Sequence, residues 1–217
     1  MPHTEVDLVV VNGESVGFDY KLQAGDRVAV YPVFEALDIA PIVKLRDAPL
    51  RRTAFVVDVN LGRLARMLRL FGFDALFDNS STDKEIVAIS VDQKRIILTR
   101  DRRLLYAKAI THGYWVRSVL PQRQLEEVVR RFDLAGLIKP FSRCAACNGL
   151  IEPVEKRQVL ELLEPNTRKY YDKFYRCPDC GKIYWEGSHI DKIRQRLAEL
   201  LNASTDATEP CTKEKNL

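Results

Sequence analysis

The sequence predicts an α/β protein in which a parallel sheet flanked by helices is followed by a small metal-binding module. Apolar strand-like segments alternate with amphipathic helices between residues 53 and 142, and this alternation is typical of crossover connections between parallel strands. Two CxxC pairs follow that region, and only two strand-like segments precede it. These observations divide the chain into residues 1–50, 53–142 and 143–201 and a polar tail, 202–217.

Charge is unevenly distributed along the 217 residues. The net charge is +4, but residues 51–142 carry 17 Lys/Arg against 10 Asp/Glu, or +7, whereas residues 1–50 carry 4 against 8, or −4. A positive middle segment favours a polyanionic partner such as RNA, with a well-solvated surface as the alternative. No apolar run approaches the roughly 18 residues of a membrane span, and the first residues lack signal-peptide features. We therefore expect a cytoplasmic protein without membrane association.

The first region contains two expected strands. Residues 6–11 form an apolar run that ends at Asn12-Gly13, and residues 27–31 alternate in polarity after Gly25-Asp26. The region is too small and too poor in regular elements to fold independently. It could instead recruit a protein partner.

The middle region opens with a buried strand over residues 55–59. The next helix is marked by apolar residues at helical spacing, and Gly72 ends it. Thr82 and Glu85 have the spacing of a capping box, which predicts the start of a second helix. The remaining apolar patterns complete the expected order: helix 61–71, strand 75–77, helix 83–92, strand 95–99, helix 103–111, strand 114–117 and helix 122–132.

Four cysteines give the most specific pattern in the chain: Cys144, Cys147, Cys177 and Cys180. Two CxxC pairs supply the four thiolates of a closed tetrahedral Zn²⁺ site, so this metal is expected to be structural; disulfides or a redox pair are the alternative. The long gap between the pairs predicts a helical insert near residues 154–163. A closing helix is expected from Ile190, and the tail is expected to be disordered.

Two carboxylates stand at expected strand ends. Asp58 and Asp101 each follow an apolar strand, and in an open parallel sheet the carboxyl ends of the strands form the ligand-binding edge. Carboxylate oxygens suit Mg²⁺ or Mn²⁺, which would activate water for phosphodiester hydrolysis. Asp83 is the expected third ligand, with Asp78 and Glu85 nearby. Alternatively these acids cap helices, and for Glu85 we favour the capping role.

Arginines surround the two strand-end aspartates and could hold an RNA backbone: Arg63, Arg66, Arg69, Arg100, Arg102 and Arg103. A solvated helix face is the alternative reading of this stripe. Near the second CxxC pair, aromatic and basic residues interleave in the manner of single-stranded nucleic-acid binding, and the candidates are Lys173, Arg176, Trp185 and His189. Some of these rings could instead pack the small ribbon.

Several of these runs resemble a known family. Residues 55–69 (FVVDVNLGRLARMLR), residues 97–101 (ILTRD) and residues 183–189 (IYWEGSH) are similar to the Mut-seven C-terminal RNase family. The resemblance implies a PIN-like nuclease fold with a zinc ribbon, ribonuclease activity, and acidic residues at Asp58, Asp83 and Asp101. Residues 8–50 are similar to the ubiquitin-like (β-grasp) domain that often precedes this nuclease, but without the hairpin and helix that open a complete domain.

The leading hypothesis is therefore a metal-dependent ribonuclease: a truncated β-grasp segment, a PIN-like domain with an acidic Mg²⁺ or Mn²⁺ site, and a zinc ribbon with four cysteine ligands. The alternative is a non-catalytic RNA-binding or ribosome-associated adaptor that uses the ribbon to recognise RNA.

Overall fold

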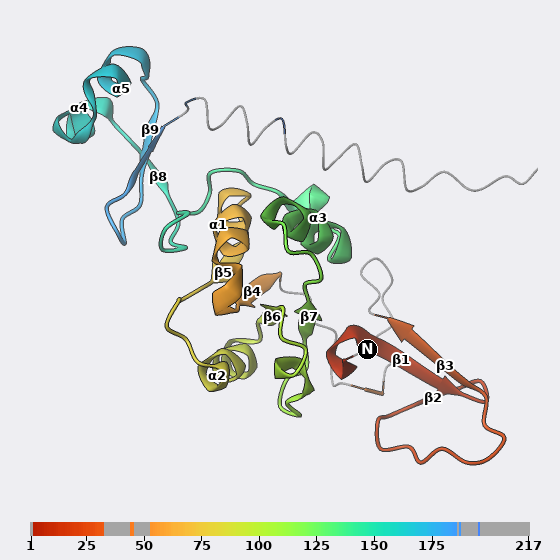
Figure 1. Cartoon of the computed structure of the whole chain (residues 1–217). Helices are drawn as coiled ribbons and strands as arrows, with labels where there is room; N and C mark the ends of the chain where they lie inside the picture. Colours follow the sequence, from red (N-terminus) through yellow and green to blue (C-terminus); the bar gives the residue numbers. More distant parts are fainter. Residues whose placement is uncertain (1, 33–43, 46–52, 186, 188–194, 196–217) are drawn as a thin grey trace, which may run out of the picture.

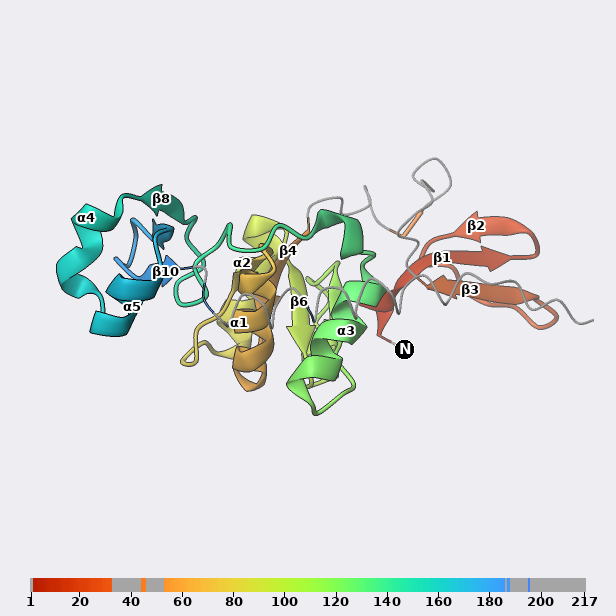
Figure 2. The same cartoon turned by 90° about the horizontal axis from the view of Figure 1, so that it is seen from above.

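The computed structural model describes residues 2–32, 44–45, 53–185, 187 and 195. Three sheets follow one another along the molecule, with the N-terminal sheet at one end, a parallel sheet in the middle and the cysteine module at the other end (Figures 1 and 2). Within the described residues, no helix is long and apolar enough to cross a membrane.

The central sheet has four parallel strands in the order β5-β4-β6-β7. This confirms the α/β fold class predicted from the sequence. Three α-helices connect or follow the strands. In chain order the elements are β4 (Ala54–Val57), α1 (Gly62–Leu70), β5 (Asp74–Leu76), α2 (Asp83–Gln93), β6 (Ile96–Thr99), β7 (Gly113–Trp115) and α3 (Pro121–Arg131).

Both faces of this sheet are covered. Phe55 and Val57 of β4 pack with α1 and α3, whereas Val56 faces the opposite side and packs with α2. Figure 1 shows α1 and α3 on one face and α2 on the other. Every residue of β4 and β6 is buried, and all of them are apolar except Thr99 at the end of β6, as expected for strands covered on both faces.

The helix expected over residues 103–111 is wrong. Only a 3-10 turn, Leu104–Tyr106, forms, and the chain becomes extended at Ala107. Leu105 and Ile110 pack in the same cluster. A continuous helix advances about 100° per residue and would turn these two side chains about 140° apart. Burial of both therefore favours an irregular segment.

The N-terminal sheet is antiparallel, in the order β2-β1-β3. Its strands are β1 (Val6–Val11), β2 (Glu14–Val16) and β3 (Val28–Pro32), and a 3-10 turn, η1 (His3–Glu5), precedes them. Asn12 and Gly13 both have positive φ, which suits the two-residue turn that joins β1 to β2. This hairpin is not predicted from the sequence, because a strand of only three residues, such as β2, is too short to give a recognisable apolar pattern.

The cysteine module contains a second antiparallel sheet, β10-β9-β8. Its strands are β8 (Glu152–Val154), β9 (Phe174–Arg176) and β10 (Ile183–Trp185), and two short helices, α4 (Lys156–Val159) and α5 (Pro165–Tyr170), lie between β8 and β9. The insert expected near 154–163 is thus a strand end followed by short helical pieces. Apart from residue 195, which is helical, the expected closing helix and the tail lie outside the described residues.

Candidate functional site

Asp58 and Asp101 follow neighbouring strands of the central sheet, so their backbones lie at the same edge. Asp58 is buried, and its amide donates to the carbonyl of Leu98 at 2.9 Å. The hydroxyl of Thr99 donates to Asp58 Oδ2 at 2.6 Å and accepts from the amide of Asp101 at 2.9 Å. Thr99 thereby links the two acids. Thr99 was not among the residues predicted from the sequence, where its only signal is a hydroxyl at the end of an apolar strand.

The third predicted acid, Asp83, lies exposed in the first turn of α2. Arg103 donates to Asp101 through its amide and its guanidinium. The hydrogen bond to Asp101, with a smaller contribution from the charge of Asp83, raises the pKa of Arg103. The hydrogen bonds from Arg103 hold the pKa of Asp101 below its usual value. Glu85 closes a capping box with Thr82, as predicted.

These acids do not form a ready-made metal cage. Among the described residues, only the cysteines bring three or more His, Cys, Asp or Glu ligand atoms within 4.8 Å of one another. Asp58, Asp83 and Asp101 therefore do not form a three-ligand set in this conformation. Asp58 and Asp101 still fit a more open site, because Mg²⁺ usually keeps several waters and needs only one or two carboxylates.

The four cysteines fit a structural zinc. All four Sγ atoms lie within 4.8 Å of one another, with Cys144 and Cys180 at 3.5 Å and Cys147 and Cys177 at 3.4 Å. Zn–S bonds of about 2.3 Å in a tetrahedron separate the sulfurs by about 3.8 Å, close to the observed spacing. The donor set is closed, so it leaves no position for a reacting water.

Both CxxC loops have the same backbone. In each, the residue after the second cysteine, Asn148 or Gly181, has φ of 74° and donates its amide to the carbonyl of the first cysteine at 2.9 Å. The amides of Cys144 and Cys177 in turn donate to carbonyls five residues later. This repeated geometry defines two matched knuckles, and only the first carries a side chain at its left-handed position.

That side chain joins the first knuckle to the central sheet. Asn148 accepts from the amide of Ala75 at 3.0 Å and donates to Asp74 at 2.8 Å. Asp74 also pairs with Arg95 at 2.7 Å and with Arg143 at 3.5 Å. A largely buried polar network therefore fixes the cysteine module to β5.

Arg69 belongs to the same junction, and its predicted place in the RNA-binding stripe needs correction. Arg69 is buried. Its Nε donates to the carbonyl of Ala75 at 2.8 Å, and its Nη1 donates to the carbonyl of Ala146 at 2.7 Å. Side chains three residues apart on an α-helix fall about 60° short of a full turn, so the Arg69 side chain points about 120° away from that of Arg63. This rotation directs Arg69 into the junction. Its side chain binds protein carbonyls.

A pocket of about 650 Å³ opens beside this junction. Four of its lining residues are arginines, and none of the described lining residues is acidic: the pocket is bounded by Asn60, Leu61, Gly62, Arg63, Arg66, Arg69, Phe77, Arg100, Val119, Pro121, Gln124, Ala145 and Ala146. Asn60 and Arg100 are close in sequence to Asp58 and Asp101, so the pocket adjoins the acidic edge.

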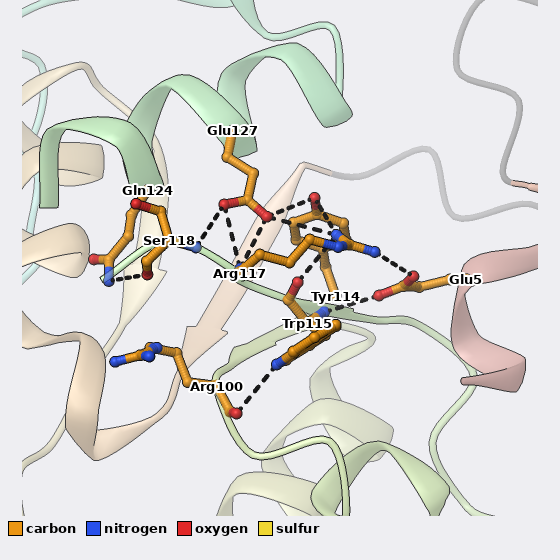
Figure 3. Close-up of polar contacts among 8 residues, drawn as sticks. All are labelled: Glu5, Arg100, Tyr114, Trp115, Arg117, Ser118, Gln124 and Glu127. Carbon is orange, nitrogen blue, oxygen red and sulfur yellow. Dashed lines mark hydrogen bonds and ion pairs between the residues drawn. The ribbon is translucent and has the colours of Figure 1, made fainter. Parts of the chain in front are cut away.

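Polar contacts hold two of the residues that line the pocket, Arg100 and Gln124 (Figure 3). Gln124 donates to the carbonyl of Ser118 at 2.9 Å, and the carbonyl of Arg100 accepts from the Trp115 indole at 3.2 Å while the Arg100 guanidinium extends away from that ring. Glu127 accepts from the amide of Ser118 at 3.1 Å. The Arg100 backbone and the Gln124 side chain are thus held by β7 and by the segment that follows it.

The N-terminal turn η1 contributes to the same segment. Glu5 accepts from the amide of Trp115 at 3.0 Å and pairs with Arg117 at 3.2 Å, and Arg117 also pairs with Glu127 (Figure 3). Burial and the hydrogen bond to Glu127 raise the pKa of Tyr114 far above its usual range, so this phenol stays neutral and donates its proton.

The remaining predicted RNA contacts lie apart from the pocket. Arg102 places its guanidinium over the Trp115 ring at 5.0 Å. Lys173 and Arg176 are exposed, and Trp185 is also exposed, with its ring 6.5 Å from that of Tyr171. His189 lies outside the described residues.

Residues 53–197 match the model of the Mut7-C RNAse domain. The chain belongs to the Mut7-C RNase domain family. Residues 1–38 match the Mut7-C ubiquitin domain, which confirms the second resemblance. A Mut7-C RNase domain implies a ribonuclease, and hence an RNA substrate.

One curated protein shows a short similarity to this Mut7-C chain. The human protein named Exonuclease mut-7 homolog is 35% identical over 37 residues, which make up 17% of this chain and 4% of the human protein. The matched part is thus a small fraction of that relative. No solved structure matches the chain.

Proposed function

We propose that this chain is a metal-dependent ribonuclease that hydrolyses RNA phosphodiester bonds at the edge carrying Asp58 and Asp101. The observation that carries the proposal is the pairing of these acids on adjacent parallel strands, linked by Thr99, within a Mut7-C RNase domain. A divalent cation bound there would lower the pKa of a water and offset charge on the phosphate.

The chain's own residues prepare this edge. Thr99 orients Asp58 by donating to one carboxylate oxygen, and the backbone places Asp101 beside it. Arg103, whose side chain is 89% exposed, pairs with Asp101, and an exposed pair of this kind contributes little to stability because solvent screens it. A divalent cation can therefore displace Arg103 at small cost. Asp83 would assist from α2, and zinc on the four cysteines would serve structure only.

The test is RNA cleavage under titration with Mg²⁺ and Mn²⁺. Asp58→Asn and Asp101→Asn should abolish metal-dependent cleavage of a labelled RNA pool, whereas Asp92→Asn, the same charge change at an exposed position of α2, should leave it intact. Zinc content and the unfolding midpoint should stay unchanged in all three. Cleavage that survives in Asp58→Asn would refute this site.

A second function, a zinc-ribbon adaptor that binds RNA without cutting it, is favoured by the pairing of Asp101 with Arg103 and by the absence of a three-acid group among the described residues. It predicts no cleavage by wild-type protein with either metal, and RNA affinity that Asp58→Asn leaves unchanged.

A further inference from the structure

The arginine-lined pocket has a charge that the described protein does not balance. Arg63, Arg66 and Arg100 are exposed at its rim, and none of them forms an ion pair with another described residue. Arg69 is different, because it is buried and donates its side-chain hydrogen bonds to the carbonyls of Ala75 and Ala146. Three arginines therefore line the pocket without an acidic partner among the described residues, and guanidinium groups are suited to binding phosphate and carboxylate anions.

The volume and the lining of the pocket suit a single nucleotide better than an extended stretch of RNA backbone. Its volume of about 650 Å³ falls within the range of small-ligand sites, about 300–1,000 Å³. Walls come from α1, from Phe77 after β5, from the segment that enters α3, and from the first knuckle. Phe77 supplies an aromatic wall on which a base can stack. Gly62 lets the Phe77 ring lie close to the start of α1, since a Cβ at residue 62 would lie only 2.7 Å from Phe77 Cζ.

We propose that this pocket binds the phosphorylated terminal nucleotide of an RNA strand, an inference that rests on the proposed RNA substrate. A terminal phosphomonoester carries about −1.5 to −2 charges at neutral pH, against one for each internal phosphodiester, and so matches several unpaired arginines better. Arg63, Arg66 and Arg100 bind the phosphate, and Phe77 stacks on the base. Because Asn60 and Arg100 adjoin the acidic edge, the bound end leads the strand toward Asp58.

The zinc module takes part in this recognition. Ala145 and Ala146, which separate the cysteines of the first knuckle, line the pocket, and Arg69 fixes their carbonyls to α1. Zinc held by Cys144, Cys147, Cys177 and Cys180 would therefore keep one wall of the nucleotide pocket in place, in addition to stabilising the ribbon.

The experiment measures binding without cleavage, using zinc-loaded protein in buffer free of Mg²⁺ and Mn²⁺. Fluorescence anisotropy compares a 12-nucleotide RNA, labelled internally, that bears a 5′-phosphate, a 3′-phosphate or two hydroxyl ends, with AMP as a competitor. The test variant is Arg63→Gln/Arg66→Gln. The matched control is Lys108→Gln/Arg130→Gln, which removes the same charge from exposed positions that do not line the pocket.

We expect one phosphorylated end to bind at least about tenfold more tightly than the hydroxyl RNA, with the preference lost in Arg63→Gln/Arg66→Gln and kept in the control. Equal binding of all three RNAs, or a preference that survives in Arg63→Gln/Arg66→Gln, would overturn the assignment. Competition by AMP without any end preference would assign the pocket to a free nucleotide and also overturn it. If the protein prefers a phosphorylated end but does not cleave RNA with Mg²⁺ or Mn²⁺, the assignment of the pocket stands and the proposed nuclease function is refuted.

Discussion

The network around Asp74 should be a main support of the junction between the central sheet and the cysteine module, and Asp74→Asn tests this. The Asp74 carboxylate receives two hydrogen bonds from Arg95, at 2.7 and 3.2 Å, and one from Asn148 at 2.8 Å. The side chains of Arg95 and Asp74 are only 9% and 13% exposed, so solvent screens their attraction little.

The expected loss follows from that burial. Removing one partner of a buried ion pair costs about 3–5 kcal/mol, and Asn keeps one acceptor, so we expect Asp74→Asn to lower the free energy of unfolding by about 2–3 kcal/mol. For a chain of this length that corresponds to about 4–12 °C in the unfolding midpoint. Calorimetry of zinc-loaded protein measures it, with Asp92→Asn as the exposed control.

The pH dependence gives a second check. Burial alone would raise the pKa of Asp74, but the hydrogen bonds from Arg95 and Asn148 outweigh it and hold the pKa below its usual value. A carboxyl with a lowered pKa stabilises the fold above its unfolded pKa, and this contribution is lost only as pH falls through the folded pKa, below about 4. The difference between wild type and Asp74→Asn should therefore stay constant from pH 8 to 5. A difference no larger than that of Asp92→Asn, or one that changes over this range, would refute the reasoning.

Three further perturbations test other contacts. Cys177→Ser should release zinc, measured by a colorimetric chelator, and should also weaken RNA binding; retained zinc at one equivalent per chain would contradict a four-cysteine site. Asn148→Gly removes the link to the sheet without backbone strain, because φ is 74° there, and should cost about 1–2 kcal/mol in thermal unfolding while zinc stays bound. Glu5→Gln breaks the pair with Arg117 and should cost about 1–2 kcal/mol; an unchanged unfolding midpoint would show that η1 does not support the segment after β7.

The sequence predicted what depends on local pattern. Apolar runs located β4 and β6, helical spacing located α1 and α3, and Thr82 with Glu85 marked the start of α2. Placing Asp58 and Asp101 at one edge needed only the rule for parallel strands.

Contacts between distant segments could not be predicted in this way. Arg69 looks like part of an exposed stripe until the carbonyls of Ala145 and Ala146, which lie 76 and 77 residues later, close over it. The irregular path between Leu105 and Ile110 likewise depends on a core that other elements complete. Thr99 acquires its role only when β4 and β6 become neighbours.

Polar side chains also cap the two edge strands of the central sheet, β5 and β7, and most of them come from the flanking modules. On β5, Asn148 of the cysteine module accepts from the amide of Ala75, and Arg69 of α1 donates to the carbonyl of Ala75. On β7, Glu5 of the N-terminal turn accepts from the amide of Trp115. Unpaired peptide groups on a border strand invite pairing with another chain, and polar side chains that occupy them prevent it. The cysteine module and the N-terminal turn therefore protect the edge strands from aggregation. Residues 53–142 expressed alone should self-associate at concentrations where the full chain does not.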